Sequence, residues 1–240
     1  MRFLLLIATL FISSASYGEE PEADTSQYRT VEVKSSRIST VERNVRDAAV
    51  YILTTRGHGS GSLVRYKGSQ LVITAQHVAS GEIGSRYIVK KDMEALSASL
   101  IYSDLTNDIA ILWLEKEFES VNPMKFSPLR DLPGVGDEIT YSGYPSSHDI
   151  MTYRGRVAGF ENIPSAGKQI LLHTFGWFGC SGSVVFDARG NIVGVLWGID
   201  SLNGMAIESM IWVSPIQNLD IDAALSEFCT STTEDVRVCG

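Results

Sequence analysis

Short apolar segments separated by turn-forming residues run through most of the chain, and they restrict its fold more than any other feature. Each has the length of a β-strand, is rich in Val, Ile, Leu, Tyr and Phe, and is followed by Gly, Ser, Asp, Asn or Pro. Strands joined by turns give this pattern, which predicts an all-β barrel or sandwich protein. The predicted strands are Ala49–Thr54, Gly61–Tyr66, Gln70–Thr74, Tyr87–Lys90, Ile109–Leu114, Glu138–Ser142, Val157–Phe160, Ile170–His173, Ser183–Phe186, Ile192–Trp197 and Met210–Val213.

Helical periodicity is nearly absent until the end of the chain. Residues 215–228 can place their apolar side chains on one helical face, so one C-terminal helix is predicted there, followed by a tail at 229–240. The residues of that face are Ile216, Leu219, Ile221, Ala224, Leu225 and Phe228.

The overall composition is that of a globular and acidic protein. Hydrophobic residues make up 44% of the 240 residues, which is too apolar for a disordered chain. The net charge of −8 argues against nucleic acid as a partner, because nucleic-acid binding requires basic patches.

The first eighteen residues have the layout of a secretory signal peptide. A positive start at Arg2 precedes an apolar stretch from Phe3 to Ile12, and small residues up to Gly18 offer cleavage sites. The apolar stretch is too short to span a bilayer, which needs about 20 residues, and no membrane span is expected after its removal. We therefore predict a signal peptide at 1–18, a secreted or periplasmic protein, and a polar arm or pro-segment at 19–45.

Three short motifs carry the chemistry. A histidine follows a predicted strand in Thr74–Val78 (TAQHV). An aspartate stands just before another predicted strand in Asn107–Leu112 (NDIAIL), and a serine between glycines leads into a third in Gly179–Val185 (GCSGSVV). Serine hydrolysis needs this set of side chains. An imidazole can take the serine proton, a carboxylate can orient the imidazole, and backbone N–H groups can stabilise the oxyanion.

These motifs resemble those of the trypsin-like (chymotrypsin-fold) serine proteases, especially the branch of HtrA/Deg proteases and glutamyl endopeptidases. Gly59–Val64, Tyr141–Pro145 and Asp187–Gly198 resemble flanking segments of the same family. HtrA and Deg proteases carry PDZ domains, and no PDZ domain is expected here, because too few residues follow the terminal helix.

The resemblance implies a fold and a set of roles. The protease domain would span 46–228, with two antiparallel β-barrels at about 46–125 and 130–214 and the active site between them. Ser181 would be the nucleophile, His77 the general base and Asp108 its orienting acid. The backbone N–H groups of Gly179 and Ser181 would form the oxyanion hole. Protein or peptide substrates, a monomeric state, no cofactor and no metal are implied.

The primary substrate pocket is expected to be apolar. By the resemblance, Phe175 lies at its base, where a preference for Lys or Arg would need an acid. Leu196 stands where glutamyl endopeptidases have a histidine, and Trp197 and Gly198 would line the cleft. We therefore expect cleavage after apolar residues.

Alternatives exist for several of these residues. Asp104 competes with Asp108 but lacks the following apolar strand. Cys180 lacks the flanking glycines of a nucleophile, and it replaces the aspartate that trypsin uses in zymogen activation. Cys229 and Cys239 could form a disulfide in an oxidising compartment, although their geometry is not readable from sequence.

Two other functions compete with proteolysis. One is a catalytically inactive, protein-binding member of the family. The other is an α/β-hydrolase esterase, but its triad would follow the chain order Ser, Asp, His, which is the opposite of the order here.

Overall fold

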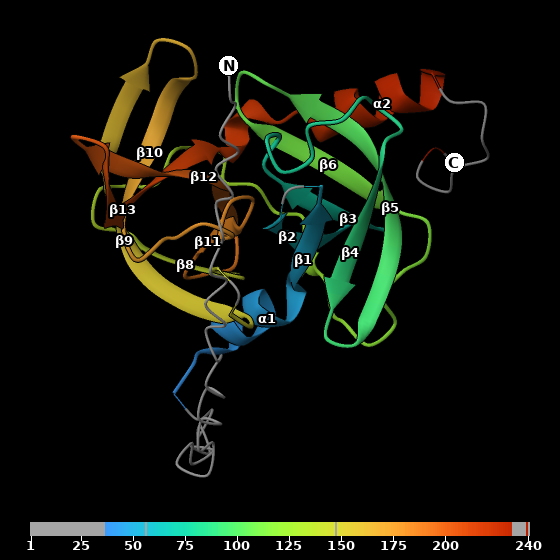
Figure 1. The fold of residues 1–240 in the computed structure, drawn as a ribbon, viewed down its shortest axis with the longest axis horizontal. Coiled ribbons are helices and arrows are strands. Elements are labelled where there is room, and N and C mark those ends of the chain that lie inside the picture. The colour runs from blue at the N-terminus through green and yellow to red at the C-terminus, as the bar shows by residue number, and fades with distance from the viewer. Residues whose placement is uncertain (1–36, 56, 147, 232–238, 240) are drawn as a thin grey trace, which may run out of the picture. The chain divides into compact units, whose positions relative to one another are not determined.

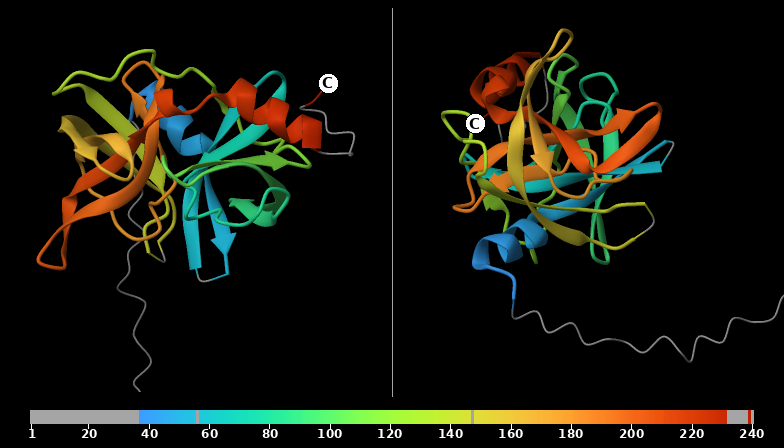
Figure 2. Two further views of the ribbon diagram at one scale, coloured as in Figure 1. Left: turned by 90° about the horizontal axis from the view of Figure 1, so that it is seen from above. Right: turned by 90° about the vertical axis from the view of Figure 1, so that its left-hand side faces the viewer.

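Two six-stranded antiparallel β-barrels lie side by side and make up most of the protein (Figure 1, Figure 2). The computed structural model describes residues 37–231, apart from 56 and 147, together with Cys239. The all-β class, the pair of barrels and the C-terminal helix predicted from the sequence are confirmed. The predicted signal peptide at 1–18 and the part of the predicted arm at 19–36 lie outside the described residues.

Barrel one is formed by the first six strands, and the pairing of β1 with β2 closes it. A short seventh strand, β7, joins β2 in parallel on the way to barrel two. These strands are β1 (Ala49–Thr54), β2 (Gly57–Tyr66), β3 (Ser69–Thr74), β4 (Arg86–Lys91), β5 (Glu94–Asp104), β6 (Ile109–Leu114) and β7 (Met124–Lys125).

Barrel two closes in the order β10-β13-β12-β11-β8-β9. Its longest strands, β9, β12 and β13, continue well beyond the segments predicted for them, and the added ends mix apolar with polar and charged residues. The strands are β8 (Glu138–Gly143), β9 (Met151–Ile163), β10 (Gly167–His173), β11 (Val184–Asp187), β12 (Ile192–Leu202) and β13 (Met205–Pro215).

The predicted polar arm at 19–45 is wrong at its C-terminal end, where a helix, α1, forms at Thr40–Ala48. Ser39 and Glu42 make a reciprocal capping box that satisfies backbone N–H groups at the helix start. Val45 and Ala48 are buried in the apolar core of barrel one. The polar face of α1 instead contacts β9 of barrel two, so this helix links the two barrels.

The contacts of α1 with barrel two are ionic and hydrogen-bonded. Glu42 forms an ion pair with Arg154, and Arg46 donates to the Thr152 hydroxyl at 3.2 Å. Arg154 holds the pKa of the nearly buried Glu42 carboxyl at about 2, well below its ordinary value of 4.5. Glu42 is therefore ionised at neutral pH.

The C-terminal helix begins later than predicted. The chain remains in β13 up to Pro215 and makes a short 3-10 turn, η2 (Ile216–Asn218), before α2 (Ile221–Ser231) starts. Asp220 accepts the Ala223 N–H at 3.0 Å, which caps the helix at that point. The predicted helix at 215–228 is thus wrong at its N-terminal end and about three residues short at its C-terminal end.

Helix α2 follows barrel two in the chain but packs on barrel one (Figure 1). Its apolar side chains Ile221, Leu225 and Phe228 join the barrel-one core. Since α1 precedes barrel one and contacts barrel two, each end of the described chain contributes a helix that connects the halves.

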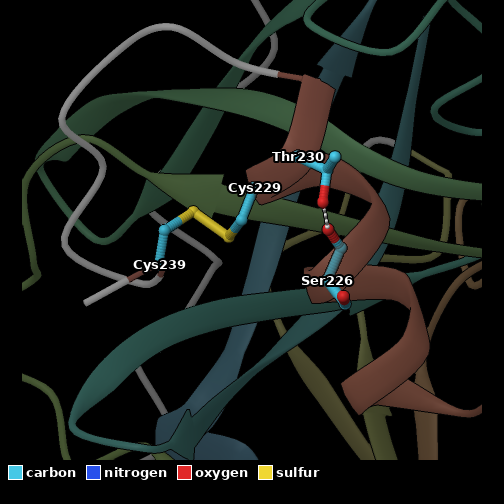
Figure 3. Close-up of a disulfide and its surroundings, with 4 residues drawn as sticks. All are labelled: Ser226, Cys229, Thr230 and Cys239. Carbon is cyan, nitrogen blue, oxygen red and sulfur yellow. Dashed lines mark hydrogen bonds between the residues drawn. A yellow bond between two sulfur atoms is a disulfide. The ribbon is translucent and has the colours of Figure 1, made fainter.

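A disulfide joins Cys229, near the end of α2, to Cys239, with 5.4 Å between their Cα atoms (Figure 3). In the same turn of the helix, the hydroxyl of Thr230, the residue after Cys229, donates to the Ser226 carbonyl at 2.7 Å (Figure 3). The third cysteine, Cys180, is a free thiol buried in barrel two.

Candidate active site

The strand register of barrel one brings His77 and Asp108 together. Strands β3 and β6 are antiparallel neighbours, and Thr74 pairs with Ala110 at the end of their ladder. His77 lies in the turn just after β3, and Asp108 lies just before β6, so both extend past the same end of this pair. The Nδ1 atom of His77 is 2.6 Å from Oδ2 of Asp108.

The aspartate holds the histidine by a second hydrogen bond. Oδ1 of Asp108 accepts the backbone N–H of His77 at 2.8 Å. The His77 side chain is 46% exposed, whereas that of Asp108 is 21% exposed. A carboxylate on Nδ1 keeps the proton there, which leaves the other ring nitrogen able to accept one.

Asp104, the competing acid of the sequence, has a different structural role. It accepts the backbone N–H groups of Thr106 and Asn107 at 2.9 and 3.0 Å and the Asn107 side-chain amide at 2.7 Å. These bonds form the turn that leads into Asp108, whose φ of +51° is in the left-handed region. Asp104 therefore shapes the loop, and Asp108 contacts the imidazole.

Residues 178–182, here called the nucleophile loop after the role expected for Ser181, carry this serine from barrel two to the face of barrel one. The carbonyl of Ser181 accepts the Ser60 N–H of β2 at 2.8 Å. Gly182 has a φ of +87°, and a Cβ atom there would lie 2.2 Å from both the Ser60 carbonyl and the Thr74 hydroxyl. Only glycine permits this close approach, and it brings Ser181 beside the segment that leads to His77.

Three backbone N–H groups of the nucleophile loop, those of Phe178, Gly179 and Ser181, donate to no acceptor among the described residues. For Gly179 and Ser181, the carbonyl in the same peptide group as the free N–H accepts a hydrogen bond. Ser146 N–H binds the Phe178 carbonyl at 2.7 Å, and Ser183 N–H binds the Cys180 carbonyl at 3.0 Å. Because a trans peptide directs its N–H opposite to its C=O, these two N–H groups are oriented by the bonds. Such a pair can bind an oxyanion.

The Ser181 hydroxyl makes no hydrogen bond among the described residues, to His77 or to any other group. Hydrogen bonds between a nucleophile and its base are often long in proteases and tighten when substrate binds.

The residues expected to form the substrate pocket lie in different surroundings. Phe175 is 39% exposed, its ring is tilted by 34° to that of Tyr153 with 5.3 Å between centroids, and its carbonyl accepts the Tyr141 hydroxyl. Leu196 is 1% exposed and belongs to the barrel-two core. A leucine inside the core does not reach the surface, whereas the Phe175 side chain is exposed.

Phe175 lines a cavity of about 700 Å³ between α1 and barrel two, whereas Leu196, Trp197 and Gly198 do not. The Trp197 indole N–H instead donates to the buried side chain of Gln169 at 2.9 Å. Of the four residues expected to form the pocket, the structure therefore places one in this cavity. Charged residues line the same cavity, among them Arg154, Arg156, Glu138 and Glu208.

Cys180 points away from the site into the barrel-two core, where it is fully buried next to Tyr141. Burial raises the pKa of its thiol. A buried and protonated thiol is a poor nucleophile.

Three residues beside the nucleophile loop have no role in the predicted site. The Ser60 hydroxyl binds the Gly179 carbonyl, the Tyr144 N–H binds the Ser60 hydroxyl, and Nε2 of His58 bonds to the Tyr144 carbonyl at 2.8 Å. Ser60 and Tyr144 lie in segments that match the family pattern, but nothing in their spacing shows a contact with residues more than 80 positions away.

The part of the chain that the structure describes holds no group of three or more His, Cys, Asp or Glu placed to bind a metal ion. Within the same residues, no helix has both the length and the apolar character needed to cross a membrane.

Comparisons with known proteins agree with this architecture. A family model described as the trypsin-like peptidase domain matches residues 59–195, which is more than half of the chain. Among curated proteins, none matches the sequence.

Solved structures share the fold at low sequence identity. The Rv3671c protease of M. tuberculosis, as a serine-to-alanine mutant in its inactive form, gives a TM-score of 0.62 at 17% identity, over 81% of this chain and 93% of that chain. The active form gives a TM-score of 0.62 at 18% identity, over 83% and 88%. The matched family model and the two-barrel fold together show that the chain belongs to the trypsin-like peptidase family of serine endopeptidases.

Proposed function

We propose that the protein is an exported serine endopeptidase in which Ser181 is the nucleophile, His77 the general base and then acid, and Asp108 the residue that orients His77. The observation that carries this proposal is the double contact of the Asp108 carboxylate with the backbone N–H and the Nδ1 of His77. A carboxylate used only for loop structure would not need to bind the imidazole as well.

The reaction has two steps. Ser181 Oγ attacks the substrate carbonyl while its proton passes to Nε2 of His77, and the N–H groups of Gly179 and Ser181 stabilise the oxyanion. His77 then gives that proton to the leaving amine, and an acyl-enzyme remains on Ser181. Water, deprotonated by His77, hydrolyses the acyl-enzyme and restores the serine.

Labelling with a fluorophosphonate serine-hydrolase probe tests the nucleophile. We expect the wild type to be labelled and Ser181→Ala to remain unlabelled. Ser183→Ala is the matched control, because the Ser183 hydroxyl is buried and without a hydrogen-bond partner, so that variant should still be labelled. Circular dichroism shows that each variant is folded. A folded wild type that is never labelled would instead support the inactive, protein-binding alternative.

We also propose cleavage after apolar residues, supported by the half-exposed Phe175 at the position expected for the pocket base. Digestion of casein, with the cut sites identified by mass spectrometry, tests this preference. Enrichment of Leu, Met or Phe before the scissile bond is expected. Enrichment of charged residues would contradict the apolar preference. It would point instead to the charged side chains that line the same cavity as Phe175, such as Arg154 and Glu208.

Export and a monomeric state complete the proposal. Export rests on the layout of residues 1–18 alone. Expression of the full-length gene, followed by N-terminal sequencing of the protein recovered outside the cytoplasm, tests it. Cleavage after Ala15 or Gly18 is expected, and recovery of the intact N-terminus from the cytoplasm would contradict it.

A further inference from the structure

We propose that Ser60 is a positioning residue that holds the nucleophile loop so that the N–H groups of Gly179 and Ser181 face the oxyanion. The inference rests on the proposed function and adds to it a residue outside the motifs of His77, Asp108 and Ser181. Ser60 belongs to barrel one, whereas the loop belongs to barrel two, so this serine connects the two halves of the site.

Every polar atom of Ser60 is engaged, and the residue is fully buried. Its hydroxyl donates to the Gly179 carbonyl at 2.7 Å and accepts the Tyr144 N–H at 2.9 Å. Its backbone N–H donates to the Ser181 carbonyl at 2.8 Å, and its carbonyl accepts the Thr74 hydroxyl at 2.7 Å. Ser60 thus binds the loop at two carbonyls, one from its side chain and one from its backbone.

The side-chain bond of Ser60 holds the carbonyl of a glycine, Gly179. Gly179 has a φ of +95°, and a glycine can leave this conformation easily because it has no Cβ. Its preceding peptide is held by the bond from Ser146 to the Phe178 carbonyl. Its following peptide is held at the Gly179 carbonyl by the Ser60 hydroxyl and at the Cys180 N–H by the Trp177 carbonyl, at 2.9 Å. With both peptides held, the direction of the Gly179 N–H is determined.

Removal of the hydroxyl would leave two buried backbone groups, the Gly179 carbonyl and the Tyr144 N–H, without this partner. Buried polar groups recover hydrogen bonds by local rearrangement, so the peptide after Gly179 would turn toward another donor. Because the two peptides meet at the Gly179 Cα atom, this rotation would strain the preceding peptide and displace the Gly179 N–H that it carries. Because oxyanion charge exists only in the transition state and the intermediate, the loss should appear in kcat rather than in KM.

The test compares Ser60→Ala with Ser62→Ala. Ser62 is the matched control, because it lies two residues further along β2 on the same face, is 2% exposed, and has a hydroxyl with no hydrogen-bond partner. On a chromogenic peptide substrate, we expect Ser60→Ala to lower kcat about 10- to 100-fold with KM within about threefold. Ser62→Ala should stay within about threefold of the wild type in both.

Two further measurements separate positioning from general damage. The inhibition constant of a peptide boronic acid, which forms a tetrahedral adduct with the serine, should rise in Ser60→Ala by about the factor by which kcat/KM falls. The midpoint of the pH dependence of kcat/KM should not move, because Ser60 makes no contact with His77. A kcat equal to that of the wild type, a loss confined to KM, or a shifted midpoint would each overturn the inference.

Ser60→Cys covers the case in which Ser60→Ala does not fold. The thiol fills similar space and donates only weakly, so kcat should lie clearly below the wild-type value, and wild-type kcat in this variant would overturn the inference. The failure of the proposed function is a separate result: a folded wild type that neither turns over substrate nor reacts with the fluorophosphonate probe.

Discussion

Both carboxylate oxygens of Asp108 bind His77, with Oδ2 2.6 Å from the ring Nδ1 and Oδ1 2.8 Å from the backbone nitrogen. The backbone bond prevents the carboxylate from rotating away from the ring. The ring bond keeps the proton on Nδ1. Position and tautomer of the imidazole therefore depend on one side chain.

Asp108→Asn should lower kcat by about 10⁴-fold, as expected when an amide replaces the carboxylate and favours the wrong imidazole tautomer. Steady-state kinetics on a peptide ester measure this loss. Asp104→Asn is the comparison, since its amide oxygen can still accept from Thr106 and Asn107. We expect a loss of less than about tenfold there, and equal losses in the two variants would contradict the assignment of Asp108.

Gly182→Ala should destabilise the protein and abolish activity, because its Cβ atom would lie 2.2 Å from the Ser60 carbonyl. Gly204→Ala is the matched control, with a φ of +79° and no atom within 4 Å of the added Cβ. Both variants carry the left-handed backbone penalty of about 1–2 kcal/mol. Only Gly182→Ala adds overpacking, of roughly 1–3 kcal/mol. Urea unfolding measures the difference, and equal free energies of unfolding would refute the close approach of loop and barrel.

The ion pair between Glu42 and Arg154 should make stability depend on acid pH. The pKa of Glu42 is lowered to about 2 by Arg154, so its contribution is fully present above the ordinary value of 4.5 and is lost as the pH falls toward 2. Because Arg154 is 63% exposed, solvent screening limits this contribution to about 1–2 kcal/mol.

Glu42→Gln should therefore reduce the free energy of unfolding at pH 6 more than at pH 3, measured by urea unfolding. The control is Glu138→Gln, whose ion pair with Arg156 is exposed on both sides and should contribute less than about 1 kcal/mol. If Glu42→Gln lowers the free energy of unfolding by the same amount at both pH values, the charge of Glu42 does not stabilise the fold.

Thiol titration should find one free cysteine that is hidden in the folded protein. Cys180 is fully buried and burial raises the pKa of its thiol, so Ellman's reagent should react only after denaturation. Denatured protein purified under oxidising conditions should give one thiol per chain, and prior reduction should give three. Rapid reaction in the native state would contradict the burial of Cys180, and three thiols without reduction would contradict the disulfide.

The sequence pattern predicts the strands that are rich in β-branched residues. It does not predict strands that are built mainly from other residues. β1 and β6 have the predicted ends, whereas β5 (Glu94–Asp104) was not predicted at all. Its first half, EALSA, contains one leucine among small and polar residues with low β-propensity. It is a strand because β4 and β6 hydrogen-bond to its two sides.

Helix α1 had a readable signal that a composition-based reading overlooks. Ser39 and Glu42 have the spacing of a capping box, although the surrounding segment is polar. Its buried residues Val45 and Ala48 find their apolar partners only in barrel one. A segment can thus look like a solvated arm in sequence and still be part of the fold.

The sequence by itself determined the all-β class and the three motifs from which the candidate site is built, because strand patterns and motifs depend on neighbours a few positions apart. Only the tertiary structure decided which partners they meet. It separated Asp108 from Asp104 by their contacts, buried Leu196 while exposing Phe175, and joined Ser60 to Gly179 across 119 positions of chain. Contacts between barrels leave no local pattern in a sequence, because they arise only when two separately closed sheets pack together.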